Sequence, residues 1–180
     1  MRNLRVAIML MAGVAAPALA QAPVPNPVIA GYGRSAVIAD AFLAPDPKLR
    51  YRVVFEVKSG AQKPEDVNNG LQKVARFVNL LGHYGIRPQP GDLVVALSGA
   101  ASSATLTAAA HAAHEKGAAN PNIELIQKLT DAGVSIRFCG QSMVGHGYTP
   151  AEINPNVKID TAAITTMATL QLQGYALIPD

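Results

Sequence analysis

Leu93-Val94-Val95-Ala96-Leu97 (LVVAL) is the stretch that decides the fold, because all five of its residues are apolar. A half-exposed strand alternates apolar and polar side chains, whereas a strand covered on both faces is apolar throughout. Strands of the second kind are typical of parallel sheets that carry helices on both sides. The run therefore predicts an inner strand of a helix-covered, parallel sheet.

Strand and helix patterns alternate on both sides of this run. The preceding segment Tyr51–Val57 (YRVVFEV) is rich in β-branched and aromatic residues and predicts another strand. Further strands are expected at 134–139, 157–159 and 175–178. Alternation over this length is typical of an α/β domain with a mostly parallel sheet. In the strand 134–139 one face carries Ser135, Arg137 and Cys139, which indicates an edge, a site or a subunit contact.

The helices are predicted from apolar spacing and from their ends. Pro64-Glu65-Asp66 has the form of a helix start. The residues after it place apolar side chains at helical spacing, namely Val67, Leu71, Val74, Val78 and Leu81. Gly82 and Gly85 should mark the end of this helix. We expect further helices at 104–116, after Asn120-Pro121 and at 161–173, with a short helical turn at 149–152.

A leader segment precedes the domain. Arg2 and Arg5 stand before an apolar run, residues 6–14, that is too short to cross a bilayer. The run is followed by Ala18-Leu19-Ala20, a small-x-small pattern typical of signal peptidase cleavage. Residues 1–20 are therefore interpreted as a cleavable signal peptide. This predicts a periplasmic or secreted protein without a stable membrane anchor.

The charge of the chain gives no reason to expect nucleic acid as a partner. The sequence holds 15 basic and 12 acidic residues, a formal net charge of +3. Two of the basic residues, Arg2 and Arg5, belong to the leader, so the remaining chain is almost neutral. It has no basic run and no cluster of basic and aromatic residues.

Residues 21–48 are interpreted as a proline-rich arm or linker. The segment holds five prolines after the leader, Pro23, Pro25, Pro27, Pro45 and Pro47. Such a composition predicts an extended segment, packed on the domain or on a neighbouring subunit. The domain itself then spans residues 49–180, which is long enough to bury a core. Asn79, beside the apolar stripe of the first helix, is expected to hydrogen-bond across a subunit contact.

Cys139 is the single cysteine of the chain and ends a predicted strand. Ligands of α/β proteins bind beyond the carboxyl ends of strands, where backbone N–H groups stabilise a thiolate, the nucleophile of sulfur exchange. We therefore predict Cys139 as the reactive residue. Gly140 would allow close backbone approach, and Gln141 and Ser142 would donate hydrogen bonds to a bound sulfur species or anion. The alternative is a structural cysteine that fills the core.

Three histidines are further candidates. His146, between two glycines in an expected loop, is predicted to pair with the thiolate or an anionic ligand, and the alternative is a solvated loop residue. His111 and His114 are three positions apart, a spacing that is compatible with joint metal ligation. We expect no further ligand to complete a set, so a surface or interface pair is the preferred interpretation. No metal or other cofactor is predicted.

The run from Asn120 to Ile178 resembles the DsrE/DsrF-like proteins. Its sharpest element is VSIRFCGQS at residues 134–142, followed by Gln173-Gly174-Tyr175. The helix segment Gly70–Leu80 (GLQKVARFVNL) carries the same resemblance. Together with the leader, these motifs identify the chain as a member of an exported, signal-peptide-bearing branch of that family.

The resemblance implies a three-layer α/β/α fold and assembly into trimers or hexamers. In the sulfur-relay members, a cysteine at the position of Cys139 carries a persulfide and passes sulfur between partner proteins. Those members have an Arg-Gly pair shortly after the cysteine, where this chain has Val144-Gly145-His146-Gly147.

Three functions follow from these observations. The first is a periplasmic sulfur carrier or sulfurtransferase-like protein that uses a Cys139 persulfide and has sulfur donor and acceptor proteins as partners. The second is a non-catalytic, oligomeric binding or assembly module in which the cysteine is structural. The third is a redox sensor that forms a disulfide between two chains. The absence of tryptophan and the low aromatic content disfavour a large flavin or nucleotide site.

Overall fold

The sheet has five strands, all parallel, in the computed structural model, which describes residues 27–180. The strands are β1 (Val53–Val57), β2 (Leu93–Leu97), β3 (Ser135–Cys139), β4 (Val157–Asp160) and β5 (Ala176–Ile178). Their order across the sheet is β4-β3-β2-β1-β5. The α/β class predicted from the sequence is confirmed. The predicted signal peptide, residues 1–20, lies outside the described residues.

The middle strand, β2, is the apolar run Leu93–Leu97, and all five of its side chains are buried. Helices cover it from both sides because the last crossover runs across the sheet in the direction opposite to the earlier ones. The first two crossovers carry the chain from β1 to β2 and from β2 to β3, one position at a time. The last crossover returns from β4 to β5 at the opposite edge. Since crossovers are right-handed, the returning helix must lie on the other face.

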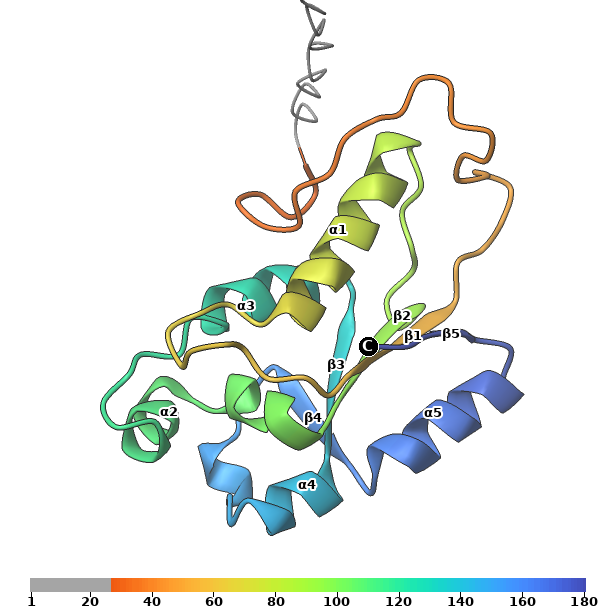
Figure 1. Ribbon diagram of the computed structural model, residues 1–180. Helices are drawn as coiled ribbons and strands as arrows, with labels where there is room; N and C mark the ends of the chain where they lie inside the picture. The colour runs from red at the N-terminus through yellow and green to blue at the C-terminus, as the bar shows by residue number, and fades with distance from the viewer. Residues whose placement is uncertain (1–26) are drawn as a thin grey trace, which may run out of the picture.

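This arrangement gives three layers (Figure 1). Helices α1 (Asn69–His83) and α3 (Ile123–Asp131) pack side by side on one face, and α5 (Ala163–Leu172) covers the other. The remaining helices gather near the carboxyl ends of the strands: η1 (Gly99–Thr105), α2 (Ala108–His114), α4 (Gly140–Gly145) and η2 (Pro150–Glu152). The predicted three-layer α/β/α fold is therefore confirmed. Within residues 27–180, every helix falls short of the length and hydropathy that a bilayer-spanning segment requires.

The predicted start of the first helix at Pro64-Glu65-Asp66 is wrong, because these residues form a turn. Helix α1 begins at Asn69, and the Asn68 side chain accepts hydrogen bonds from the N–H groups of the first turn. A buried asparagine that satisfies these donors fixes the start more strongly than a proline does. The predicted end, marked by Gly82 and Gly85, is confirmed, since α1 ends at His83.

The single helix predicted over 104–116 is two elements, η1 and α2, with a break at Leu106. The Leu106 side chain is fully buried and its backbone pairs with Ile153. The Thr107 side chain then caps α2 by accepting from the N–H of Ala110. Tertiary contacts of Leu106 thus override the helix preference of the surrounding alanines. The small-residue segment 98–103 belongs mostly to η1.

Part of the predicted arm packs on α1. Ile29 is buried, and the Asn79 side chain accepts from its N–H at 2.7 Å and donates to the carbonyls of Tyr32 and Gly33. Gly33 has a φ of +59°, and a Cβ there would lie 2.3 Å from the backbone nitrogen of Arg76. Asn79 therefore binds the arm of its own chain, so its assignment to a subunit contact is wrong.

Replacing Asn79 by alanine should release this part of the arm. Without the Asn79 side chain, one buried backbone N–H and several carbonyls of residues 29–33 lose their hydrogen-bond partner. The loss should lower the free energy of unfolding by roughly 1–3 kcal/mol. The matched control is Asn69→Ala, an exposed asparagine on the same helix. Urea denaturation and limited proteolysis of the arm would measure the effect. Equal stability of the two variants would contradict the role assigned to Asn79.

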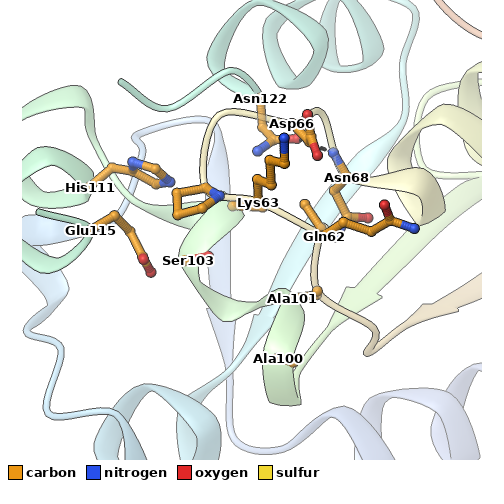
Figure 2. Close-up of a pocket in the computed structure, with 14 residues that line it drawn as sticks. Gln62, Lys63, Asp66, Asn68, Ala100, Ala101, Ser103, His111, Glu115 and Asn122 are labelled. Atoms are coloured by element: carbon orange, nitrogen blue, oxygen red, sulfur yellow. Dashed lines mark hydrogen bonds between the residues drawn. The ribbon is translucent and has the colours of Figure 1, made fainter. Parts of the chain in front are cut away.

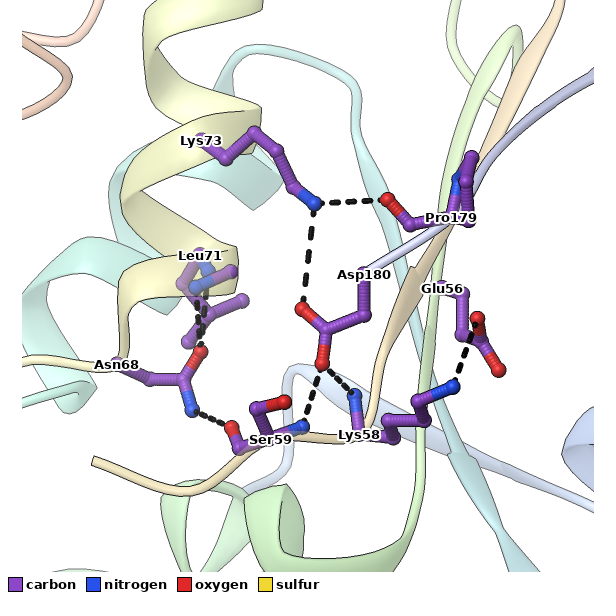
Figure 3. A network of polar contacts seen from close by, with 9 residues as sticks. Glu56, Lys58, Ser59, Asn68, Leu71, Lys73, Pro179 and Asp180 are labelled. Carbon is purple, nitrogen blue, oxygen red and sulfur yellow. Dashed lines mark hydrogen bonds and ion pairs between the residues drawn. The ribbon is translucent and has the colours of Figure 1, made fainter. Parts of the chain in front are cut away.

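The end of β5 is tied to the end of β1 by a polar network (Figure 3). The Asp180 carboxylate accepts hydrogen bonds from the backbone N–H groups of Lys58 and Ser59 at 3.0 and 2.6 Å. Lys73 of α1 reaches the same carboxylate at 3.9 Å and donates to the Pro179 carbonyl. The last described residues thus join the sheet to the α1 layer.

Candidate functional site

Cys139 is the last residue of β3 and lies opposite Asp160, the last residue of β4. The chain leaves these two neighbouring strands in different directions. After β3 it enters α4 and then packs on the η1–α2 segment, where the Thr107 N–H bonds the Glu152 carbonyl. After β4 it enters α5 on the opposite face of the sheet. Such a divergence at the carboxyl ends of neighbouring strands is where open α/β sheets bind ligands.

Four donors surround the buried Cys139 sulfur. They are the backbone N–H groups of Ala163, Ser142 and Gln141 and the hydroxyl of Ser142. The N–H groups belong to first turns of α5 and α4, so no carbonyl of their own helix occupies them. Burial raises the pKa of a thiol and is the largest single influence here, but the donors together outweigh it. The pKa of Cys139 is therefore lowered, which favours the thiolate.

Gly140 is required by the close approach of β4. A Cβ at this position would lie 2.8 Å from the carbonyl oxygen of Asp160 and 3.3 Å from that of Thr161. Both neighbours are backbone atoms, so a larger residue would push the β3–α4 turn away from the β4–α5 turn. The sequence-predicted role of Gly140, close backbone approach, is thus seen toward β4, within the protein itself.

The other predicted site residues are only partly brought together. Ser142 lies at the sulfur, and its Oγ also accepts from the Gly99 N–H at 3.2 Å. The backbone N–H of Gln141 faces the sulfur, whereas its side-chain amide donates to the Thr161 carbonyl at 3.3 Å. The Gln141 side chain therefore links α4 to the β4–α5 turn.

His146 directly follows α4 and does not pair with the thiol. Its Nε2 lies 3.1 Å from the Gly99 carbonyl oxygen, so this nitrogen carries a proton and donates it. The His146 ring stacks on the Tyr148 ring, with centroids 5.3 Å apart. His146 and Ser142 thus hold the same residue, Gly99, one through its carbonyl and the other through its N–H.

Sequence reasoning missed the contribution of the β4–α5 turn. The donor from this turn is the backbone N–H of Ala163. A backbone donor has no side-chain motif from which the sequence could predict it. Asp160 beside it accepts from Thr166 at 2.6 Å and lies 3.4 Å from Arg137. The available signal was the strand pattern itself, which placed Arg137 and Cys139 on one face of β3. Strand β3 itself is an inner strand that pairs with the edge strand β4.

His111 and His114 do not form a joint metal site. His111 is buried with its Nδ1 3.0 Å from the Ala118 carbonyl, whereas His114 pairs with Glu152 at 2.8 Å. The Glu152 carboxylate has its pKa lowered to about 2, first by the Thr149 N–H and then by His114. Across residues 27–180, no group of three or more histidine, cysteine or acidic side chains could hold a metal ion.

Removing the Ser142 hydroxyl should raise the pKa of Cys139. The hydroxyl favours the thiolate, so Ser142→Ala is expected to shift the pH midpoint of thiol alkylation upward and to slow alkylation severalfold near neutral pH. Iodoacetamide rates measured across the pH range would show the shift. Ser103→Ala, a serine of η1 that is not among the donors at the sulfur, is the control. An unchanged midpoint in Ser142→Ala would contradict the role of this hydroxyl.

The fold and this site define a class: a three-layer α/β protein with a parallel sheet and one activated thiol at the carboxyl end of an inner strand. The chain belongs to the DsrE/DsrF-like family, whose profile matches residues 52–179. The match covers nearly the whole sheet domain, and it confirms the resemblance seen in the sequence.

Two solved structures share the fold. One is a protein of unknown function, MTH1491 from Methanobacterium thermoautotrophicum, with 17% identity and a TM-score of 0.53. The other is the ychN protein from E. coli, with 16% identity and a TM-score of 0.52. Each comparison covers 72% of this chain and 99% of the other. At these identities the likeness concerns the fold alone. Among curated protein sequences, none matches this chain significantly.

Proposed function

We propose that this protein is a sulfur carrier, or a sulfurtransferase-like protein, in which Cys139 holds sulfur as a persulfide. The observation that carries the proposal is the set of four donors around a buried sulfur, which lowers the pKa of the thiol. Membership of a family associated with sulfur relay supports it. From the predicted leader we also propose that the carrier is periplasmic or secreted.

Loading needs no oxidant when the donor already contains a sulfur–sulfur bond. The Cys139 thiolate attacks the outer sulfur of thiosulfate, a new S–S bond forms on the cysteine, and the electron pair of the broken bond leaves with sulfite. A polysulfide reacts in the same way and leaves shortened by one sulfur atom.

Unloading is favoured by the same lowered pKa. A thiolate on an acceptor attacks the outer sulfur of the persulfide, and Cys139 leaves as a thiolate. Thiols of lower pKa are better leaving groups, so the donors around Cys139 favour this step too. The chain contains one cysteine, so the attacking thiol must come from another molecule. This requirement suits a carrier better than a dithiol oxidoreductase.

Intact-mass analysis after exposure to thiosulfate or polysulfide tests the proposal. A carrier gains the mass of one or more sulfur atoms and loses it again on treatment with a thiol reductant. A wild-type protein whose Cys139 alkylates normally but takes up no sulfur from either donor would rule the carrier out. That result would favour the alternative function, a binding or assembly module.

We also propose that the protein forms a homo-oligomer, which the assembly-module alternative requires as well. Large apolar side chains are exposed on α5 and α4: Ile164 and Leu172, about two turns apart on α5, are 73% and 91% exposed, and Val144 on α4 is 72% exposed. Side chains at this spacing lie on one side of a helix. Covering them would remove a sizeable apolar area from water.

A charge on this side of α5 should dissociate the oligomer. Ile164→Glu is expected to yield a monomer by size-exclusion chromatography with light scattering, because a buried carboxylate without a partner is strongly unfavourable. Thr169→Glu adds the same charge at an exposed position of α5 that lies roughly 140° around the helix axis from Ile164, and it should leave the assembly unchanged. An assembly that persists in Ile164→Glu would exclude this surface as the contact.

A further inference from the structure

A polar cavity of about 210 Å³ lies apart from Cys139 (Figure 2). It opens between the loop from Gly60 to Asp66 and the η1–α2 segment, and none of the residues whose donors surround the Cys139 sulfur lines it. The volume is below the roughly 300–1,000 Å³ that pockets for drug-sized ligands occupy, so the cavity suits a smaller molecule.

One wall of the cavity is a ladder of buried asparagines. The Asn122 Oδ1 accepts from the Asn68 N–H at 2.8 Å, and the Asn122 amide donates to Asn120 at 3.0 Å. The Asn120 amide in turn donates to the Leu106 carbonyl at 2.8 Å. Each amide is held by protein partners, so this wall is rigid and keeps the cavity open.

His111 presents an unpartnered acceptor to this cavity. The residue is only 1% exposed, and its Nδ1 lies 3.0 Å from the Ala118 carbonyl oxygen. A carbonyl only accepts, so Nδ1 carries the proton and Nε2 of the neutral ring has a free lone pair. Within residues 27–180, the hydrogen bond made by this ring is the one at Nδ1, and Nε2 is accessible rather than enclosed. Figure 2 shows the ring directed from α2 toward the loop that holds Lys63.

The charges around the cavity favour a cation. Glu115, four residues after His111, lines the same wall beside it. The other two ionisable residues that line the cavity, Lys63 and Asp66, belong to the loop between Gly60 and Asp66. Among the carboxylate and ammonium groups of the lining, two carboxylates, Asp66 and Glu115, stand against the single ammonium group of Lys63. An imidazole acceptor that is open to the cavity and lies next to a carboxylate matches a ligand group that donates hydrogen bonds and is positively charged.

We propose that this cavity binds a small organic amine, with its ammonium group between the Nε2 of His111 and the carboxylate of Glu115. The site is separate from the sulfur chemistry at Cys139. Ligand binding should therefore survive Cys139→Ser, so failure of one proposal leaves the other standing.

Three probes of equal length and different charge test this proposal: n-butylammonium, 1-butanol and butyrate. Protein with ¹⁵N-labelled histidine is titrated with each at a pH about one unit above the ordinary histidine pKa, and the ring nitrogens of His111 are followed by NMR. We expect a saturable shift of Nε2 with n-butylammonium alone. Absence of saturation at tens of millimolar, or an equal response to butyrate, would overturn the proposal.

Variants identify the groups that bind the amine. Glu115→Gln keeps the shape but removes the charge, and it should weaken n-butylammonium binding about tenfold, the equivalent of roughly 1.4 kcal/mol. Glu65→Gln removes a carboxylate from the loop between Gly60 and Asp66. The Glu65 side chain does not line the cavity, so this change should leave binding unchanged. His111→Gln should abolish binding. If this substitution of a buried residue prevents folding, the comparison of Glu115→Gln with Glu65→Gln decides the outcome. Equal weakening by Glu115→Gln and Glu65→Gln would contradict the site.

Discussion

Cys139→Ser is expected to abolish sulfur loading completely while the fold and the oligomer remain intact. Serine is close to cysteine in size, so the packing at the end of β3 changes little. Its hydroxyl does not ionise near neutral pH and cannot hold a persulfide, so the attack on thiosulfate or polysulfide has no nucleophile. Intact-mass spectra of the two proteins, treated side by side, measure the effect, with thermal unfolding as the check on folding.

Two results would contradict this expectation. Equal mass gains in wild type and Cys139→Ser would mean that the sulfur is bound elsewhere or without a covalent bond. Loss of folding in Cys139→Ser would mean that the thiol is structural, as in the assembly-module alternative. A covalent dimer on non-reducing gels, absent from the serine variant, would instead favour the redox sensor.

Gly140→Ala is expected to lower both stability and thiol reactivity. The added methyl group would lie 2.8 Å from the Asp160 carbonyl oxygen, so the ends of β3 and β4 must separate. Overpacking of this kind costs roughly 1–3 kcal/mol of unfolding free energy. Separation also moves the Ala163 N–H away from the sulfur, which raises the pKa of Cys139 and slows its alkylation near neutral pH.

Gly145→Ala is the matched control for this experiment. It lies in the same helix, α4, and a Cβ there meets no atom within 4 Å. Alanine is the better helix former, so this variant should be as stable as the wild type or slightly more stable. Chemical denaturation and iodoacetamide rates compare the two. If Gly140→Ala behaved like Gly145→Ala, close approach to β4 would not be the reason for this glycine.

The sequence predicts the sheet well because a strand covered on both faces leaves a local signature. The apolar run Leu93–Leu97 and the cysteine at the end of 134–139 both lie where they were expected. The predicted start of α1 at Pro64 is wrong because the Asn68 side chain caps the helix instead. This capping depends on the burial of Asn68 by segments that are distant in the sequence. Local propensity does not contain that information.

The site was harder to predict than the fold because much of it consists of backbone. Cys139, Gly140 and Ser142 come together as one local motif, which the sequence reveals. The Ala163 N–H comes from a distant turn, and its contribution depends on the pairing of β3 with β4. Helical spacing likewise grouped His111 with His114, but their surroundings separate the two, since the His111 ring is buried beside the cavity and the His114 ring pairs with Glu152.

The sheet order also determines when the protein can finish folding. Strand β1 obtains its second neighbour, β5, from residues 176–178, and the bond between Lys58 and Asp180 spans 122 positions. Contacts so distant along the chain close late and slow the folding reaction. Until then, β1 is an open, apolar edge that can pair with another chain. The nascent polypeptide thus stays unfolded for longer and needs protection from aggregation, and variants that weaken β5 should precipitate rather than lose activity.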